Sequence, residues 1–168
     1  MNTLSDIKNH DHARIQEEDF NLIRDTAKGV YVEVGTFHGA SAYAASQNAD
    51  KVWTIDIYSW EPHIWHELGC RNVQFFMGTS VDICPNIDLV VGGIDVLFID
   101  GSHEFDSVKK DIESLEPLVK KGGIIMFHDY RENSSGVWDA VQEYLKREKP
   151  EIVKEPTKGS SILVCKKQ

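Results

Sequence analysis

The chain has 168 residues, of which 41% are hydrophobic and 27% charged, and its formal net charge is −9. Length and composition fit one globular domain and exclude wholesale disorder. The acidic excess argues against nucleic acid as the main partner, because binding phosphate groups needs clustered Lys and Arg. There is no apolar run long enough for a membrane helix, no apolar signal region over residues 1–19, and no C-x-x-C pair among the three cysteines. We therefore expect a cytoplasmic protein with no membrane partner.

Short β-branched runs alternate with helical patterns along the chain. Residues 1–28 are predicted to form a helical leader with one helix around Asp19 to Lys28, and residues 29–168 to form the main domain. Nearly continuous apolar runs predict strands covered on both faces, at Val30–Val34, Val52–Ile57, Val73–Met77, Ile94–Asp100 and Gly123–His128, with two short edge strands at Glu151–Lys154 and Ser161–Cys165. Helical spacing of apolar residues predicts helices at Gly39–Gln47, Phe105–Val119 and Val137–Arg147.

This order of elements predicts an α/β fold. Strands that alternate with helices form a parallel sheet with right-handed crossovers, which is a doubly wound α-β-α sandwich of three layers. The two short C-terminal strands can add antiparallel edges. In such a sheet, ligands bind beyond the carboxyl ends of the strands.

The first strand ends in a glycine-containing turn, with Gly35 and Gly39. Asp56 ends the second strand, where a carboxylate can accept hydrogen bonds from both hydroxyls of a ribose. A dinucleotide fits poorly, because the third glycine of G-x-G-x-x-G is missing and Glu33 would repel a pyrophosphate. S-adenosylmethionine, with an ammonium, a sulfonium, a ribose and no phosphate, fits better. The alternative is that the glycines only form a turn and Asp56 is a solvated strand end.

A second group of polar residues follows the fourth and fifth predicted strands, and it consists of Asp100, His103, His128 and Asp129. Because these strands end on the same edge of the sheet, the four side chains are expected to converge. Two carboxylates with an imidazole suit Mg²⁺, or Mn²⁺ or Fe²⁺, and His103 could accept a proton near neutral pH. Alternatively, Asp100 only caps the following helix and His128 is packed in the core.

Four segments together carry a family resemblance: Val32–Ser41, Trp53–Asp56, Leu97–His103 and Leu118–Tyr130. They resemble class I S-adenosylmethionine-dependent methyltransferases, and most of all the metal-dependent O-methyltransferases of the macrocin and sugar-directed group, which are related to cephalosporin hydroxylase-like proteins. The resemblance runs from about Gly29 to Val141. It implies a seven-stranded, mostly parallel sheet whose last strand is antiparallel.

The resemblance also implies roles for individual residues. Asp100 and His103 would be catalytic, with His103 as the general base, and the metal ligands would be Asp100, Asp129 and His128. Many relatives carry an acidic residue at the position of His128, and often an acidic residue at the position of Thr79. The residues expected to bind S-adenosylmethionine are Glu33, Gly35, Thr36, Phe37, Gly39, Ser41, Asp56, Ile57, Gly78, Thr79, Ser80 and Asp100.

The function expected from the resemblance is metal-assisted O-methylation of a hydroxyl on a small molecule, such as a sugar or natural product. With no second domain, the acceptor pocket must come from loops, and the candidates are Tyr58–His66 and Tyr130–Trp138. The first of these could instead be a surface helix that buries Trp65 and Leu68. A homodimer could supply a lid, and His63 and His66, three residues apart, raise a less favoured second metal site.

Three rival functions remain open. The same fold could methylate a small amine, or it could be a non-catalytic or otherwise diverged S-adenosylmethionine-binding module. A nicotinamide-dependent oxidoreductase is the least favoured, because of the glycine pattern and Glu33.

Overall fold

The computed structural model describes residues 7, 15–61, 63–132 and 135–168. The rest of the predicted leader, and residues 62, 133 and 134 of the two candidate acceptor segments, lie outside the described residues. The helices are α2 (Glu17–Thr26), α3 (Ala40–Ser46), α4 (Ile64–Glu67), α5 (Ser80–Val91), α6 (Phe105–Leu115) and α7 (Ser135–Glu148), with a 3₁₀ turn at Glu116–Leu118. The strands are β1 (Val30–Val34), β2 (Lys51–Asp56), β3 (Val73–Met77), β4 (Ile94–Ile99), β5 (Val119–Phe127), β6 (Glu151–Lys154) and β7 (Leu163–Lys166).

These strands form one seven-stranded sheet in the order β3-β2-β1-β4-β5-β7-β6. The first five strands pair in parallel, whereas β7 is antiparallel to both β5 and β6. The predicted fold is confirmed, including the antiparallel last strand. The order reverses between β1 and β4, so the chain leaves a crevice beyond their carboxyl ends, where doubly wound sheets bind ligands.

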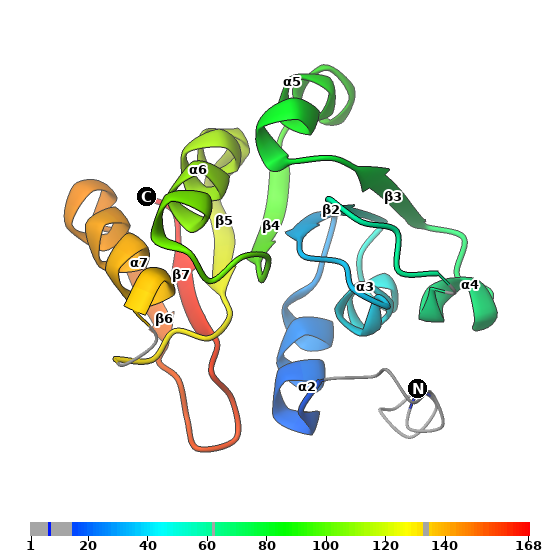
Figure 1. Cartoon of the computed structure of the whole chain (residues 1–168), viewed down its shortest axis with the longest axis horizontal. Helices are drawn as coiled ribbons and strands as arrows, with labels where there is room; N and C mark the ends of the chain where they lie inside the picture. The colour runs from blue at the N-terminus through cyan, green and yellow to red at the C-terminus, as the bar shows by residue number, and fades with distance from the viewer. Residues whose placement is uncertain (1–6, 8–14, 62, 133–134) are drawn as a thin grey trace.

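Helices cover both faces of the sheet, and each face has its own core (Figure 1). Along β4, Leu97 and Ile99 pack with α6 and α7, whereas Val96 and Phe98 face α2 and α3. This alternation follows from the two-residue period of a strand, and it explains why the strands read as continuously apolar. The helix of the leader is part of this packing, because Phe20 and Ile23 of α2 are fully buried.

Two of the predicted boundaries shift by four residues. The predicted helix Phe105–Val119 ends at Leu115 and tightens into the 3₁₀ turn that holds Pro117, because proline has no N–H to continue the α-helical ladder. The fifth strand begins at Val119, four residues earlier than predicted. Among the described residues, no helix combines the length and the apolar character that crossing a membrane requires.

Candidate functional site

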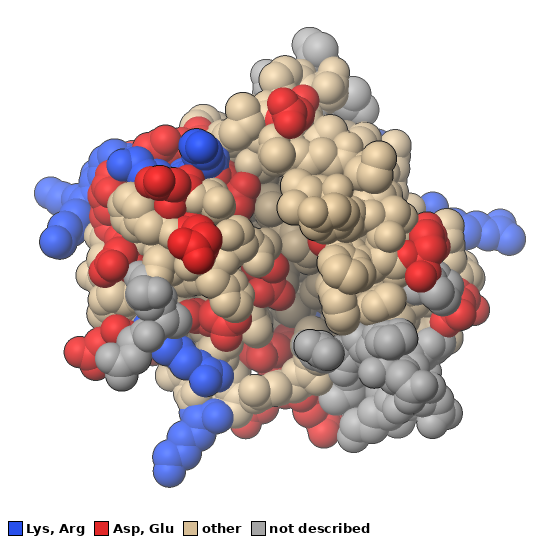
Figure 2. Space-filling view, in the orientation of Figure 1, with Lys and Arg blue, Asp and Glu red and all other residues tan. Residues whose placement is uncertain are grey.

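A cavity of about 850 Å³ opens beyond the carboxyl ends of β1, β2 and β4. Figure 2 shows this face of the molecule hollowed between the helices, with acidic side chains inside the hollow. All the residues predicted to bind S-adenosylmethionine except Glu33 line the cavity: Gly35, Thr36, Phe37, Gly39, Ser41, Asp56, Ile57, Gly78, Thr79, Ser80 and Asp100. The structure therefore brings together residues that are spread over 66 positions of the sequence, from 35 to 100.

The turn after β1 is held in place by Asp56 at the end of β2. Its Oδ2 accepts hydrogen bonds from the backbone N–H groups of Thr36 (2.9 Å) and Phe37 (3.0 Å), and its Oδ1 accepts one from Tyr58 (3.1 Å). The turn needs positive φ at Gly35 (95°) and even at Phe37 (46°), a conformation that costs energy for residues other than glycine. Asp56 therefore stabilises the strained turn while it also faces the cavity.

Gly35 also allows β1 to approach β4 closely. A Cβ atom at this position would overlap the backbone carbonyl of Asp100. The turn after β1 and the end of β4 thus share one wall of the cavity, and a side chain at position 35 would push them apart.

Glu33 is the exception among the predicted cofactor residues, because its side chain lies in the core behind the cavity wall. Its carboxylate accepts hydrogen bonds from Thr54 Oγ1 (2.7 Å) and the Tyr31 hydroxyl (3.3 Å). Burial raises the pKa of Glu33 to about 8, against the opposing effect of its hydrogen bonds with Thr54 and Ser41. Glu33 does not line the cavity, whereas Ser41, one of its hydrogen-bond partners, does.

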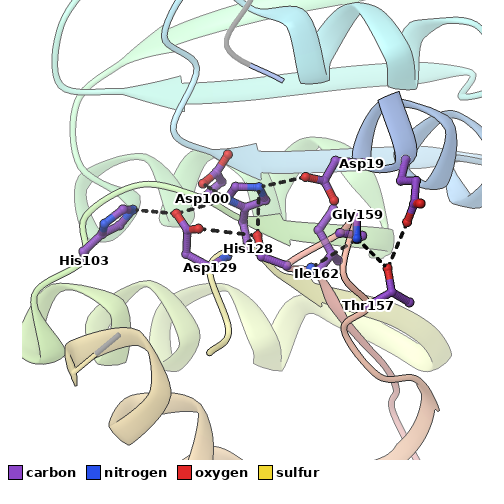
Figure 3. Close-up of polar contacts among 11 residues, drawn as sticks. Asp19, Asp100, His103, His128, Asp129, Thr157, Gly159 and Ile162 are labelled. Atoms are coloured by element: carbon purple, nitrogen blue, oxygen red, sulfur yellow. Dashed lines mark hydrogen bonds and ion pairs between the residues drawn. The ribbon is translucent and has the colours of Figure 1, made fainter. Parts of the chain in front are cut away.

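The predicted convergence of acids and histidines at the ends of β4 and β5 is present (Figure 3). His128 Nδ1 lies 3.0 Å from Asp100 Oδ1 and 3.2 Å from Asp129 Oδ2, and His103 Nε2 lies 3.2 Å from Asp129 Oδ2. Asp100 and His128 line the cavity. Asp129 has a φ of 52°, and such strained backbone is concentrated at functional sites.

His128 is the most strongly perturbed of these groups. Burial disfavours its charge, but contacts with Asp100, Asp129 and Asp19 outweigh burial and raise the pKa of His128 to about 12. The Nδ1 atom is at ion-pair distance from both carboxylates, yet it lacks the angle of a hydrogen bond to either. In the absence of another cation, His128 itself supplies positive charge to the two carboxylates.

Asp19 of α2 is a member of this network that the sequence patterns did not reveal. Its Oδ2 lies 3.3 Å from His128 Nε2, its side chain is 1% exposed, and its Oδ1 is buried without a hydrogen-bond partner. Since 109 residues separate the two side chains, no local spacing could have linked them. An acidic residue on the apolar face of α2, beside Phe20 and Ile23, is the one signal that the sequence offers.

The donor atoms fit a hard divalent cation. One donor atom each from Asp100, His103 and Asp129 lie within 4.8 Å of one another, and two carboxylates with one imidazole leave positions for water or substrate oxygens. Asp100 and Asp129, two of the predicted ligands, belong to this group. Its third member is His103 and not the predicted His128, whose Nδ1 lies beside the same carboxylates.

The two candidate acceptor segments differ. Tyr58 and Trp60 line the cavity, whereas Trp65 is buried over Gly39 and Leu68 stays 36% exposed. Tyr130 and Trp138 stack on each other 4.6 Å apart and pack against the core that faces α6 and α7. Of the described parts of both segments, only the first reaches the cavity.

Several residues that line the cavity were not predicted, among them Asp111 and Lys110. Asp111 of α6 accepts a hydrogen bond from the Ser80 hydroxyl (2.6 Å), and burial raises the pKa of Asp111. Lys110 also lines the cavity. No sequence pattern points to either residue, because both belong to an amphipathic helix whose polar positions read as solvent-exposed.

Comparisons with known proteins agree with this geometry. A family model described as a methyltransferase domain matches residues 32–130. Uncharacterized protein R132 of Acanthamoeba polyphaga mimivirus is 36% identical over 114 residues, which are 61% of this chain and 52% of that protein. Uncharacterized protein y4gI of Sinorhizobium fredii is 28% identical over 128 residues, 64% of this chain and 14% of that protein. The chain therefore spans about half the length of the mimivirus protein and a much smaller part of y4gI.

Solved structures share the fold at low sequence identity. A putative caffeoyl-CoA O-methyltransferase from Staphylococcus aureus has a TM-score of 0.75 and 17% identity, covering 98% of this chain and 90% of that one. An O-methyltransferase from Bacillus cereus in complex with SAH has a TM-score of 0.69 and 14% identity, over 98% and 86%. The MycE methyltransferase of the mycinamycin biosynthetic pathway, in complex with Mg, SAH and mycinamycin VI, has a TM-score of 0.61 and 18% identity, over 89% and 47%. The chain belongs to the methyltransferase domain family and has the fold of S-adenosylmethionine-dependent methyltransferases.

Proposed function

We propose that the protein transfers a methyl group from S-adenosylmethionine to a hydroxyl of a small molecule, with a divalent cation bound by Asp100 and Asp129. The observation that carries this proposal is the position of Asp100. It lines the cavity that holds the predicted cofactor residues, and it also belongs to the group of metal donors. A reacting oxygen held beside Asp100 would therefore lie next to both the cofactor cavity and the metal donors.

The cavity wall offers groups that suit each part of S-adenosylmethionine. Asp56 keeps acceptor capacity on Oδ1, which accepts one backbone hydrogen bond while Oδ2 accepts two, so Oδ1 can also accept a hydrogen bond from a ribose hydroxyl. The turn at Gly35 and the hydroxyl of Ser41 would surround the methionine part. Ile57, Gly78, Thr79 and Ser80 would surround the adenine.

The residues around the acceptor have different roles in the reaction. Bound S-adenosylmethionine supplies a methyl group on a good leaving group, and a divalent cation lowers the pKa of a hydroxyl near it. The acceptor oxygen would form a bond to the methyl carbon as the carbon–sulfur bond breaks, and its proton would pass to His103. Asp129 orients His103 through the 3.2 Å contact at Nε2, which leaves Nδ1 as the proton acceptor. Positioning the two reactants and excluding water supply the rest of the rate enhancement.

The acceptor side of the cavity has an aromatic rim. Tyr58 and Trp60 line it and are themselves exposed, with ring centroids 5.9 Å apart. Such rings pack against the apolar faces of sugars and aromatic compounds. The complex of MycE with Mg, SAH and a natural product supports the same class of acceptor for this protein.

The test is a methyl-transfer assay with S-adenosylmethionine and a panel of hydroxylated sugars and phenols, with Mg²⁺ or with EDTA. We expect turnover that needs the cation and falls at least about 100-fold in Asp100→Asn, while Asp25→Asn on the exposed side of α2 leaves it unchanged. Turnover that EDTA does not affect would select a metal-independent transferase, in which His128 supplies the positive charge between the carboxylates. Absence of S-adenosylhomocysteine formation with binding intact would select a non-catalytic module.

A further inference from the structure

We propose that Glu61, His63 and His66 form a second cation site, suited to Zn²⁺ or a similar transition metal and separate from the Asp100 cluster. One donor atom from each residue lies within 4.8 Å of the other two. His63 Nδ1 lies 3.0 Å from Glu61 Oε1, and the rings of His63 and His66 are 6.2 Å apart. The segment between β2 and β3 supplies all three residues.

His63 is held as a fixed ligand would be. Its side chain is 1% exposed, and its ring stacks on Trp65 at 4.1 Å with an angle of 13°, beside Phe75 at 5.1 Å. Its Nε2 atom is buried and has no hydrogen-bond partner. An unpartnered buried nitrogen costs free energy and leaves a position open for a ligand.

The site can be reached from solvent. Glu61 and His66 are exposed, and an ion can therefore reach the site from solvent.

The types of donor atom predict the metal. Two imidazoles and one carboxylate favour Zn²⁺, Co²⁺ or Ni²⁺, whereas Mg²⁺ prefers oxygen ligands. Three protein ligands leave one position open for water or another group. The Asp100 cluster, with two carboxylates, has the opposite preference, so the two sites can be distinguished by their metals.

An ion at this site would fix one wall of the cavity. The same segment carries Tyr58 and Trp60, which line the cavity, and it is tied to the glycine turn by the hydrogen bond from Ile64 N to His38 O (2.9 Å). Cross-linking Glu61 to His63 and His66 reduces the freedom of the segment in between. We expect the bound ion to tighten ligand binding in the cavity through this restraint.

The test is calorimetric titration of the metal-free protein with Zn²⁺, together with Co²⁺ absorption spectroscopy. The wild type should bind one Zn²⁺ that excess Mg²⁺ does not displace, and its Co²⁺ complex should show visible bands of low coordination number. Asp100→Asn with Asp129→Asn should keep this ion. His66→Gln should weaken its binding at least about 10-fold, and Glu67→Gln, one residue further along α4, should not.

Two results overturn the proposal. One is Zn²⁺ binding that His66→Gln leaves unchanged, and the other is Zn²⁺ binding that disappears in the double Asp100 and Asp129 variant. His63→Gln is a second variant, but the buried ring of His63 also packs the core, so its loss can affect folding. The exposed His66 therefore gives the decisive test. None of these readouts uses methyl transfer, and they stand apart from the proposed function.

Discussion

Asp56 shows how one carboxylate links the fold to the candidate site. Its three backbone hydrogen bonds hold the turn after β1, and its side chain also lines the cavity. The position of Asp56 at the end of a strand predicted that it faces the cavity. The hydrogen bonds to the turn could not be predicted, because the turn bends back onto Asp56 only when β1 and β2 are paired.

Replacing Asp56 is expected to damage ligand binding more than folding. Asp56→Asn keeps one oxygen acceptor but loses the charge that attracts backbone N–H groups and ribose hydroxyls. We expect affinity for S-adenosylhomocysteine to fall about 10-fold or more, a loss of about 1.4 kcal/mol or more, measured by calorimetry. Asp82→Asn, another acidic residue of the cavity wall, is the control, and an equal loss in both variants would contradict a specific role for Asp56.

Asp19 is expected to position His128 through the buried contact at Nε2. Asp19→Ala removes that contact and should lower the affinity of the Asp100 cluster for Mn²⁺ by about 10- to 100-fold, measured by calorimetry without cofactor. Asp19→Asn keeps an acceptor oxygen and should recover part of the affinity. Asp25→Ala, on the exposed part of the same helix, is the control. If Asp19→Ala binds Mn²⁺ as the wild type does, Asp19 only packs α2 against the sheet.

Glu33 gives a pH dependence of stability. Its pKa of about 8 in the folded protein exceeds the ordinary value of 4.5 because of burial, so the folded state holds a proton that the unfolded state releases. Its protonation supports folding below about pH 4.5 to the full extent, and this contribution is lost as the pH rises through 8. The loss between pH 5 and 9 should amount to a few kcal/mol, up to about 5 kcal/mol.

The variant Glu33→Gln tests this expectation, because the amide keeps the shape and cannot ionise. Urea unfolding at pH 6 and pH 9 should show a smaller decline in the free energy of unfolding for Glu33→Gln than for the wild type. Equal declines would mean that other groups carry the pH dependence. Tyr31 and Asp100, which interact electrostatically with Glu33, are the first of these groups to examine.

At the scale of elements, the packing of α4 against the glycine turn should carry measurable energy. A Cβ at Gly39 would overlap the ring of Trp65, and Gly39 also has a φ of 80°. Gly39→Ala should therefore lower the free energy of unfolding by about 2–4 kcal/mol, from overpacking and from backbone strain together.

Gly69→Ala separates the two causes, because Gly69 has a similar φ of 73° and open space around it. It should cost only the backbone strain, about 1 kcal/mol or slightly more. Denaturant unfolding of both variants gives the difference. If the two variants lose the same stability, the Trp65 contact with the turn contributes little.

Most elements were predictable from the sequence, and the failures have clear causes. The runs at β1 and β3 were predicted with their observed bounds, because β-branched and aromatic residues in close succession favour a strand. Helix α5 was not predicted, since Pro85 lies inside it and proline normally breaks a helix. Thr79 starts this helix by accepting a hydrogen bond from Asp82 N, a signal that competes with its expected role at the adenine.

At the scale of the whole molecule, the parallel sheet explains why the candidate site could be predicted at all. Residues at the ends of β1, β2, β4 and β5 meet at one edge because these strands run in the same direction. The direction of a side chain within a strand was harder to predict. Glu33 lies one residue before the strand end on the face of Tyr31, and its side chain is fully buried and does not line the cavity.

Contacts between distant segments lay beyond sequence reasoning. The contact between Asp19 and His128 depends on how α2 docks on the sheet. The packing of Tyr130 and Trp138 against the core depends on how α7 packs. Both are decided by the three-dimensional complementarity of apolar surfaces. Periodic patterns along the chain reveal which face of a helix is buried, but not which residues it meets.

The cavity beyond β1, β2 and β4 is the proposed binding site of S-adenosylmethionine. Calorimetric titration of the wild type with S-adenosylmethionine, S-adenosylhomocysteine and NAD measures this directly. We predict one binding site for the two sulfur compounds, none for NAD, and a loss of binding in Gly35→Val, whose side chain would collide with the end of β4, while the Asp25→Asn control binds normally. Binding of NAD in place of the sulfur compounds, or no binding of either sulfur compound to the folded wild type, would contradict the account.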